Sequence, residues 1–171
     1  MAIDFYWFNQ AVAYWALVLF FIPFKYLKQI FFFAFLGGFV YTWIVQAMAV
    51  QVFEFWSFKR DLLSWWDIPL FFVMSWFAVT YLYGYLLYRY PRFQVFILAF
   101  FVLWGTLMSY TARLLKKLDM TNWSVLETLM FAVFSHVMLL YVFKFMHKVQ
   151  DLGVHEDMLE LTFGSLLRKK E

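Results

Sequence analysis

Five long runs of apolar residues, separated by short basic loops, constrain the fold of this 171-residue chain more than any other feature. Four of them contain no charged residue: Phe5–Phe24, Gln29–Phe53, Ile68–Tyr88 and Phe93–Ala112. The fifth, Trp123–Phe143, contains one carboxylate, that of Glu127. A helix of about 20 apolar residues matches the roughly 30 Å hydrocarbon core of a bilayer. The runs therefore predict an integral membrane protein.

The composition supports the same class. Hydrophobic residues make up 65% of the chain and aromatic residues 26%, with 25 Phe, 9 Trp and 11 Tyr. A soluble domain of this size has too few polar residues to cover so much apolar surface. The absence of cysteine excludes disulfides, thiolate catalysis and Cys-ligated metals. The basic residues lie at the ends of the runs, which argues for membrane-interface anchors and against a nucleic-acid-binding surface.

We expect an all-α protein, a polytopic transmembrane bundle of five helices in one domain over residues 1–148. The predicted spans cover about residues 5–23, 30–53, 68–88, 93–113 and 123–144. Pro23 ends the first helix, and Pro69 is tolerated in the first turn of the third. The first run is expected to be an uncleaved helix, because no basic segment of a signal peptide precedes it.

The last residues, 149–171, have a different pattern. Leu152, Leu159 and Phe163 share a face if this segment is helical, and Arg168–Lys170 follow. This pattern is typical of a short amphipathic helix on the cytoplasmic membrane surface. A frayed tail is the alternative, because Gly153 disfavours a helix.

The distribution of Lys and Arg predicts the orientation. Five spans place nine of these residues on the side of the C-terminus and five on the opposite side. We expect the protein in the cell (inner) membrane. The positive-inside rule then places the N-terminus outside and the C-terminus in the cytoplasm.

Three charged residues come together at the predicted outer end of the bundle: Glu54, Arg113 and Glu127. An unpaired carboxylate inside a span is costly, so we expect Glu127 to be protonated or paired. Arg113 is its nearest cation, since the fourth and fifth helices form a hairpin, and Glu54 competes for it. These residues could form a pocket for a polar head group, a proton or a cation. Alternatively they form an interfacial ion pair that only fixes helix packing, with Glu54 solvated.

His136 lies in the middle of the fifth span, directly after Ser135. A histidine at this depth is a candidate functional residue, although a hydroxyl group on another helix could satisfy a purely structural imidazole. It lies nine residues from Glu127, on the opposite face of the helix, so the two cannot pair. His147 and its helical neighbours, Asp151 and His155, are expected to form a solvated face and not a metal site.

No motif for catalysis or for a cofactor is present. The chain contains no phosphate-binding glycine loop and no Gly-Xaa-Ser-Xaa-Gly nucleophile elbow. We therefore expect neither cofactor nor metal. Catalytic residues stay unknown, and the candidates are Glu127, Glu54, Arg113 and His136.

Four short features extend over roughly residues 54–140: Trp56 after the second run, Ile68-Pro69, the Tyr90-Pro91 turn, and Asn122-Trp123. In these features the chain resembles a group of uncharacterised five-span membrane proteins of spore-forming Firmicutes. The resemblance implies a location in a bacterial inner membrane. It implies no activity, because none is established for the group.

Three functions are compatible with these observations. The absence of motifs favours an accessory or structural subunit that packs with a protein partner or with another copy of itself in the lipid bilayer. The second is a membrane-embedded lipid- or isoprenoid-handling enzyme with a polar pocket at the outer end of the bundle. The third is a component of an oligomeric transporter or channel.

Overall fold

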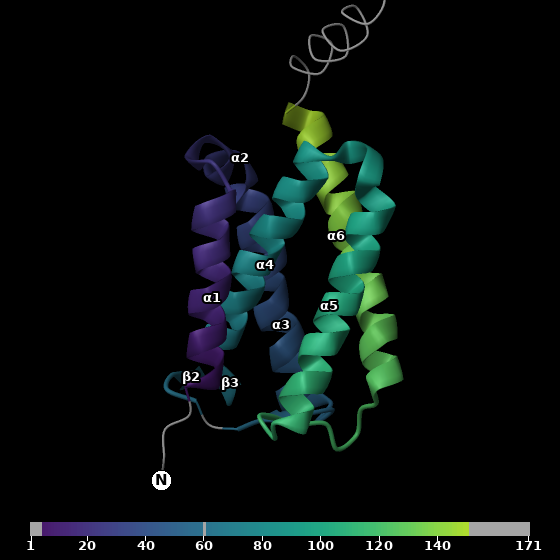
Figure 1. Ribbon diagram of the computed structural model, residues 1–171. Coiled ribbons are helices and arrows are strands. Elements are labelled where there is room, and N and C mark those ends of the chain that lie inside the picture. Colours follow the sequence, from purple (N-terminus) through teal and green to yellow (C-terminus); the bar gives the residue numbers. More distant parts are fainter. Residues whose placement is uncertain (1–4, 60, 151–171) are drawn as a thin grey trace, which may run out of the picture.

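The computed structural model describes residues 5–59 and 61–150, with side chains to residue 147. The predicted amphipathic segment beyond Gln150, together with Asp151 and His155, lies outside the described residues. Within them the helices run up and down side by side as an elongated bundle (Figure 1).

The helices fall into five rods in the described part of the chain. The first is α1 (Tyr6–Phe21). The second is continuous and consists of α2 (Phe24–Ala34), a π-helical segment (Phe35–Val40), α3 (Tyr41–Ala47) and a second π-helical segment (Met48–Val52). The remaining rods are α4 (Leu70–Arg89), α5 (Gln94–Leu114), which follows a short 3-10 turn (Pro91–Phe93), and α6 (Val125–Gln150).

Four of these rods are long and apolar enough to cross a membrane: Phe24–Val52, Leu70–Arg89, Pro91–Leu114 and Val125–His147. This result confirms an all-α protein with helices of membrane-spanning character. The first predicted span is not among the four. Its helix, α1, has 16 residues, which corresponds to about 24 Å at 1.5 Å per residue.

The second rod begins earlier than predicted. It starts at Phe24, immediately after Pro23, and not near residue 30. Ile22 is extended, as expected for a residue before proline, so the chain reverses there and a new helix follows at once. Lys25 and Lys28 therefore lie inside the helix, where their long stems can lie along apolar surface with the ammonium groups at its end.

Glycines let the second rod approach α4 closely. A Cβ atom on Gly38 would lie 2.7 Å from the Cα atom of Phe77, a backbone atom that cannot move aside. Gly38 belongs to the π-helical segment, whose extra residue per turn changes the helical phase of the residues that follow.

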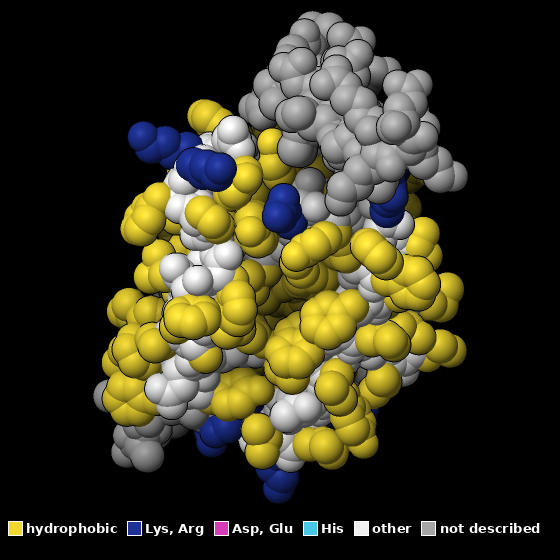
Figure 2. Space-filling model, turned by 45° about the horizontal axis from the view of Figure 1, so that its top comes forward, with side chains coloured by type: hydrophobic (Ala, Val, Ile, Leu, Met, Phe, Trp, Pro, Cys, Tyr) yellow, Lys and Arg dark blue, Asp and Glu magenta, His cyan; other side chains and the backbone are white. Residues whose placement is uncertain are grey.

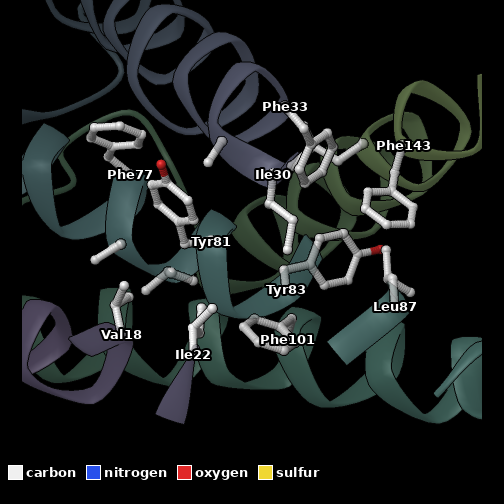
Figure 3. Packing of buried hydrophobic residues seen from close by; sticks show 14 of the residues in the cluster. Val18, Ile22, Ile30, Phe33, Phe77, Tyr81, Tyr83, Leu87, Phe101 and Phe143 are labelled. Atoms are coloured by element: carbon white, nitrogen blue, oxygen red, sulfur yellow. The ribbon is translucent and has the colours of Figure 1, made fainter. Parts of the chain in front are cut away.

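The core surrounds α4, which lies in the centre of the bundle. Tyr83 is 1% exposed and is buried with Ile30 and Phe33 of α2 and Phe143 of α6 (Figure 3). The Tyr83 hydroxyl donates to the backbone carbonyl of His136 at 3.0 Å, which joins α4 to α6.

One end of the bundle is closed by two short antiparallel strand pairs, which an all-helical prediction did not include. β1 (Ser57–Phe58) pairs with β4 (Leu118–Asp119), and β2 (Ser64–Trp65) pairs with β3 (Ile68–Pro69). The first pair joins the loop before α4 to the loop before α6. The second is a hairpin in which both turn residues, Trp66 and Asp67, have positive φ, as in a type I′ turn.

The outer surface has the character of a lipid-facing surface. Large apolar side chains such as Phe20, 83% exposed, and Val95, 77% exposed, point away from the bundle. Figure 2 shows hydrophobic side chains over the flanks and Lys and Arg towards the two ends of the molecule. This arrangement suits a helix bundle in a membrane.

Candidate functional site: a cavity inside the bundle

The structure does not bring the predicted charged cluster together. Glu54, Arg113 and Glu127 are all exposed. Among the described residues, no ion pair joins any two of them. Glu54 instead lies in a turn with positive φ, where its carbonyl oxygen accepts a hydrogen bond of 3.2 Å from the Asn122 side chain.

Glu127 is held by the start of its own helix. Its carboxylate accepts a hydrogen bond from the backbone N–H of Ser124 at 2.6 Å. In return, the backbone N–H of Glu127 donates to the Ser124 hydroxyl at 3.2 Å. This reciprocal pair is a capping box, which satisfies two N–H groups that the first turn of a helix leaves without partners. The geometry gives Glu127 a structural role, and the expected pair with Arg113 is not formed.

A cavity of about 100 Å³ lies inside the bundle, between α3, α4, α5 and α6. Its polar walls come from hydroxyl, carboxamide and imidazole groups of the helices: Tyr41, Thr42, Gln46, Thr80, Tyr83, Ser109, Ser135 and His136. Apolar and aromatic side chains of the two joined loops form its floor: Trp56, Phe58, Leu118, Met120 and Trp123. The cavity thus extends from the middle of the bundle to its closed end.

His136 presents a hydrogen-bond acceptor to this cavity. The side chain is 4% exposed, and its Nδ1 atom lies 2.8 Å from the carbonyl oxygen of Ala132. A carbonyl oxygen can only accept, so Nδ1 carries the proton and Nε2 of the neutral ring carries the lone pair. Within the described residues Nε2 has no hydrogen-bond partner. His136 therefore offers the cavity an unused acceptor.

Gln46 presents a hydrogen-bond donor to the same cavity. The indole N–H of Trp56 donates to Oε1 of Gln46 at 2.9 Å. Because an indole N–H can only donate, this contact fixes which end of the carboxamide is the oxygen. The Nε2 amino group has no partner in the described part of the chain, although the residue is 8% exposed. Gln46 therefore leaves two N–H groups available to a bound molecule.

Most of the other polar groups in the wall are already satisfied. The Tyr41 hydroxyl and the Ser135 Oγ atom are 3.0 Å apart. Thr80 donates to the Trp76 carbonyl oxygen at 2.8 Å within its own helix. These side chains hold the wall together, whereas His136, Gln46 and the hydroxyl groups of Thr42 and Ser109 keep hydrogen-bonding capacity for a bound molecule.

The wall carries no formal charge. None of the described residues that line the cavity is Asp, Glu, Lys or Arg. The described part of the chain also contains no cluster of His, Cys, Asp and Glu that could hold a metal ion. Aromatic rings surround the imidazole, with the ring centroids of Tyr83 at 5.5 Å and Trp76 at 6.3 Å. The arrangement can hydrogen-bond an uncharged molecule and shield it from water.

His136 was among the candidates from the sequence, whereas Gln46 was not. The sequence did contain a sign of a role for Gln46, because it is a carboxamide inside an uncharged apolar run. Polar side chains in a span face other helices or a cavity in preference to lipid.

Comparison of the chain with protein-family models, with curated proteins and with solved structures finds no significant match.

Proposed function

We propose that this protein is a small membrane protein that binds a single-chain lipid by its uncharged, hydroxyl-bearing head group. One observation carries the proposal. The unpartnered acceptor of His136 and the unpartnered donor of Gln46 line the same charge-free cavity inside the helix bundle. Buried polar groups are normally satisfied, and a site that leaves donors and acceptors unused is suited to a complementary ligand.

The ligand is uncharged. A charged head group in this cavity would lose its hydration without gaining an opposite charge from the wall, and that loss is costly. The ligand also carries a hydroxyl or another neutral donor, because the lone pair of His136 can only accept. A ligand with carbonyl oxygens alone, such as a quinone, would leave His136 without a partner.

The two polar contacts lie at different depths. Tyr41 of α3 hydrogen-bonds to Ser135 of α6, so these residues mark one level of the bundle. Gln46 lies five residues further along α3, roughly 7 Å nearer the closed end at 1.5 Å per residue. A head group with two separated oxygen atoms, such as a glycerol ester, suits this spacing better than a single hydroxyl.

The size of the cavity argues for a head group and not for a whole lipid. About 100 Å³ is somewhat less than the roughly 150 Å³ of an engineered apolar cavity that holds benzene. A hydrocarbon chain attached to the head must therefore lie outside the cavity. A bilayer supplies both the ligand and the surroundings for its chain.

We place the protein in a bacterial inner membrane with five spans, of which α1 is the one in addition to the four long apolar rods. Trp15 of α1 donates to the Met74 carbonyl oxygen of α4 at 3.1 Å, so α1 packs along a rod of spanning length. The excess of basic residues favours the end with the strand pairs outside and the opposite end in the cytoplasm.

The test is direct binding of 1-monolaurin to the protein in lipid nanodiscs, measured with radiolabelled ligand. We expect saturable binding that His136→Ala weakens by roughly tenfold or more, as expected when a buried polar contact is lost. Methyl laurate, which lacks the hydroxyls, and laurate, which is charged, should compete poorly. Gln46→Met removes the donor and should also weaken binding. Its matched control is Trp56→Phe, which removes the bond between the two side chains but leaves the Gln46 donor.

The proposal fails if 1-monolaurin does not bind, or if His136→Ala binds it as well as the unchanged protein. In that event the accessory-subunit hypothesis becomes the leading one. It predicts a stoichiometric protein partner or a homo-oligomer that cross-linking in membranes would capture. The oligomeric transporter or channel is the second alternative, and flux through reconstituted vesicles would reveal it.

A further inference from the structure

The second rod and α6 run antiparallel beside each other and form one side of the cavity. Three contacts at successive turns join the two rods: Phe33 with Phe143, Gly37 with Leu139, and Tyr41 with Ser135. Each step moves four residues forward on the second rod and four residues back on α6. The next pair in this register is therefore Val45 and Phe131, and both residues line the cavity.

The two rods separate towards the closed end of the bundle. A Cβ atom on Gly37 would lie 2.5 Å from the end of the Leu139 side chain, so the rods are close at that level. At the next contact a whole Tyr41 side chain and a hydrogen bond of 3.0 Å are needed to reach Ser135. Beyond it, no hydrogen bond or ring contact joins α3 to α6 in the described part of the chain, and Figure 1 shows α3 and the lower half of α6 apart. The rods are connected again only at the closed end, through the loop before α6.

Val45 lies at the border between the lipid-facing and the cavity-facing sides of α3. Ile44, on one side of it, is 52% exposed. On its other side, Thr42 and Gln46 are buried and line the cavity. Because residues one, three and four positions apart lie around the helix in this order, the Val45 side chain faces the gap between α3 and α6.

Phe131 has the same position on α6. Phe134, on one side of it, is 64% exposed, whereas Ala132 and Ser135 on its other side are buried in the cavity wall. Phe131 itself is half-buried. At this level a layer one side chain thick, formed by Val45 and Phe131, therefore separates the cavity from the lipid.

The other sides of the cavity are closed by close contacts. Between α4 and α5, a Cβ atom on Gly105 would lie 2.9 Å from the Trp76 indole. The second rod approaches α4 at Gly38, where a Cβ atom would lie 2.7 Å from the Cα atom of Phe77. α5 and α6 pack along each other as a hairpin, and the β1–β4 pair fastens the closed end. Opening any of these sides would move a helix or break backbone hydrogen bonds, whereas the α3–α6 side requires only side chains to move.

We propose that the gap between Val45 and Phe131 is a window through which the ligand enters from the bilayer, and that the hydrocarbon chain of the bound lipid leaves the cavity there and lies along α3 and α6. The identity of this occupant, an alkyl chain, rests on the proposed function. Both window residues are apolar, so a chain that passes between them stays in an apolar environment. A cavity of about 100 Å³ holds the head group alone, so the chain needs such an exit.

The window also gives the ligand a direction. Gln46 follows Val45 directly, so its donor lies just inside the window, and His136 lies deeper in the bundle. A glycerol monoester would place a hydroxyl at His136, an ester oxygen at the amino group of Gln46 and the first carbons of its chain between Val45 and Phe131. In this order the polar atoms meet the unused groups and the apolar atoms meet apolar side chains.

The window can be tested without any lipid ligand, because the chain contains no cysteine. Ser109→Cys places a single thiol in the cavity wall on α5, a helix that does not border the window. In nanodiscs, modification of this thiol by neutral methyl methanethiosulfonate is followed by mass spectrometry. Phe131→Ala should raise the rate several-fold, because neighbouring groups fill the space of a truncated ring only in part. Val45→Phe, which adds a ring to the window, should lower the rate.

Two matched controls make the same changes on the lipid-facing sides of the same helices. Phe134→Ala truncates a ring on α6, and Ile44→Phe adds one on α3. Both should leave the rate unchanged. The window is wrong if neither Phe131→Ala nor Val45→Phe changes the rate, or if the two controls change it equally. Either result is independent of whether 1-monolaurin binds.

The position of the chain has a test of its own. A glycerol monoester with a photoreactive diazirine on the first carbons of its chain is bound to the protein in nanodiscs and irradiated, and the labelled peptides are identified by mass spectrometry. The labelling that excess 1-monolaurin suppresses should fall on the peptides that contain Val45 and Phe131. Peptides of α1 should carry only labelling that the competitor does not change, as expected for contact with bulk lipid.

The outcomes separate the two proposals. If 1-monolaurin binds but the suppressed labelling falls on α1 or on α5 and not beside the window, the chain does not pass between α3 and α6. This inference then fails while the proposed function stands. If 1-monolaurin does not bind at all, the proposed function fails and the position assigned to the chain fails with it, whereas the thiol measurements still decide whether the window exists.

Discussion

The phenolic oxygen of Tyr41 and the Oγ atom of Ser135 are 3.0 Å apart, and this hydrogen bond joins α3 to α6 beside the cavity. Ser135 precedes His136, and Tyr41 precedes Gln46 by five residues on the same rod. His136 and Gln46 are therefore positioned by one contact between their helices.

Tyr41→Phe should loosen this positioning. The change removes the hydrogen bond and leaves the 7%-exposed Ser135 hydroxyl without it, at a cost of about 1 kcal/mol in the free energy of unfolding. Unfolding in mixed micelles of increasing SDS content would measure the loss. Tyr110→Phe, at a position that is 42% exposed, is the control and should be nearly neutral. Equal stability of the two variants would argue against a structural role for the contact.

Gly38→Ala should be more destabilising than Gly37→Ala. At residue 38 the new Cβ atom meets backbone, 2.7 Å from Cα of Phe77, whereas at residue 37 it meets the end of the Leu139 side chain. A backbone clash can be relieved only by moving a helix, and overpacking of this kind costs about 1–3 kcal/mol. The same SDS titration would rank the variants. A reversed order would show that α2–α3 does not approach α4 as described.

Ser124→Ala should destabilise the start of α6 by about 1 kcal/mol through loss of its N-cap. The exposed position of Glu127 and its bond to Ser124 predict that Glu127→Gln leaves lipid binding intact. Amide hydrogen exchange over the first turn of α6 would report the loss of the cap, and the nanodisc assay would report binding. A loss of binding in a folded Glu127→Gln protein would show that the Glu127 carboxylate has a functional role.

His136 should hold the tautomer with the proton on Nδ1, since that atom faces the Ala132 carbonyl oxygen at 2.8 Å. Solid-state NMR of ¹⁵N-histidine-labelled protein in lipid would identify it. Addition of 1-monolaurin should shift the Nε2 signal of His136 towards that of a hydrogen-bonded nitrogen. His147, whose Nδ1 faces the Phe143 carbonyl oxygen of its own helix, is the internal control and should not shift.

The helices were largely predictable from the sequence because apolar runs of spanning length have few alternatives. Pro69 begins a helix at Leu70 as expected. The start at Phe24 was missed because two lysines suggested a loop, whereas Pro23 alone makes the turn. The strand pairs could not be predicted, since Ser57 and Asp119 meet only after the bundle has formed.

The site was predictable only in part. The sequence Ser124-Val-Leu-Glu127 has the spacing of a capping box, which explains Glu127 without a buried partner. His136 stood out by its depth in the span. The significance of Gln46 depends on Trp56, which lies in a loop and donates a hydrogen bond to the oxygen of the Gln46 carboxamide. Such a contact has no signature in the spacing of residues along the chain.

The pairing of β1 with β4 also determines how this bundle can deform. At that end, backbone hydrogen bonds such as the one from Lys59 to Lys117, 3.0 Å long, fasten the α5–α6 hairpin to the segment that leads into α4. At the opposite end, the described connections are the short turns at Pro23 and at Pro91–Phe93. The hairpin of α5 and α6 is thus fastened to α4 at both ends of the bundle, by backbone hydrogen bonds at one end and by the three-residue turn at the other, and this double attachment resists its separation from α4.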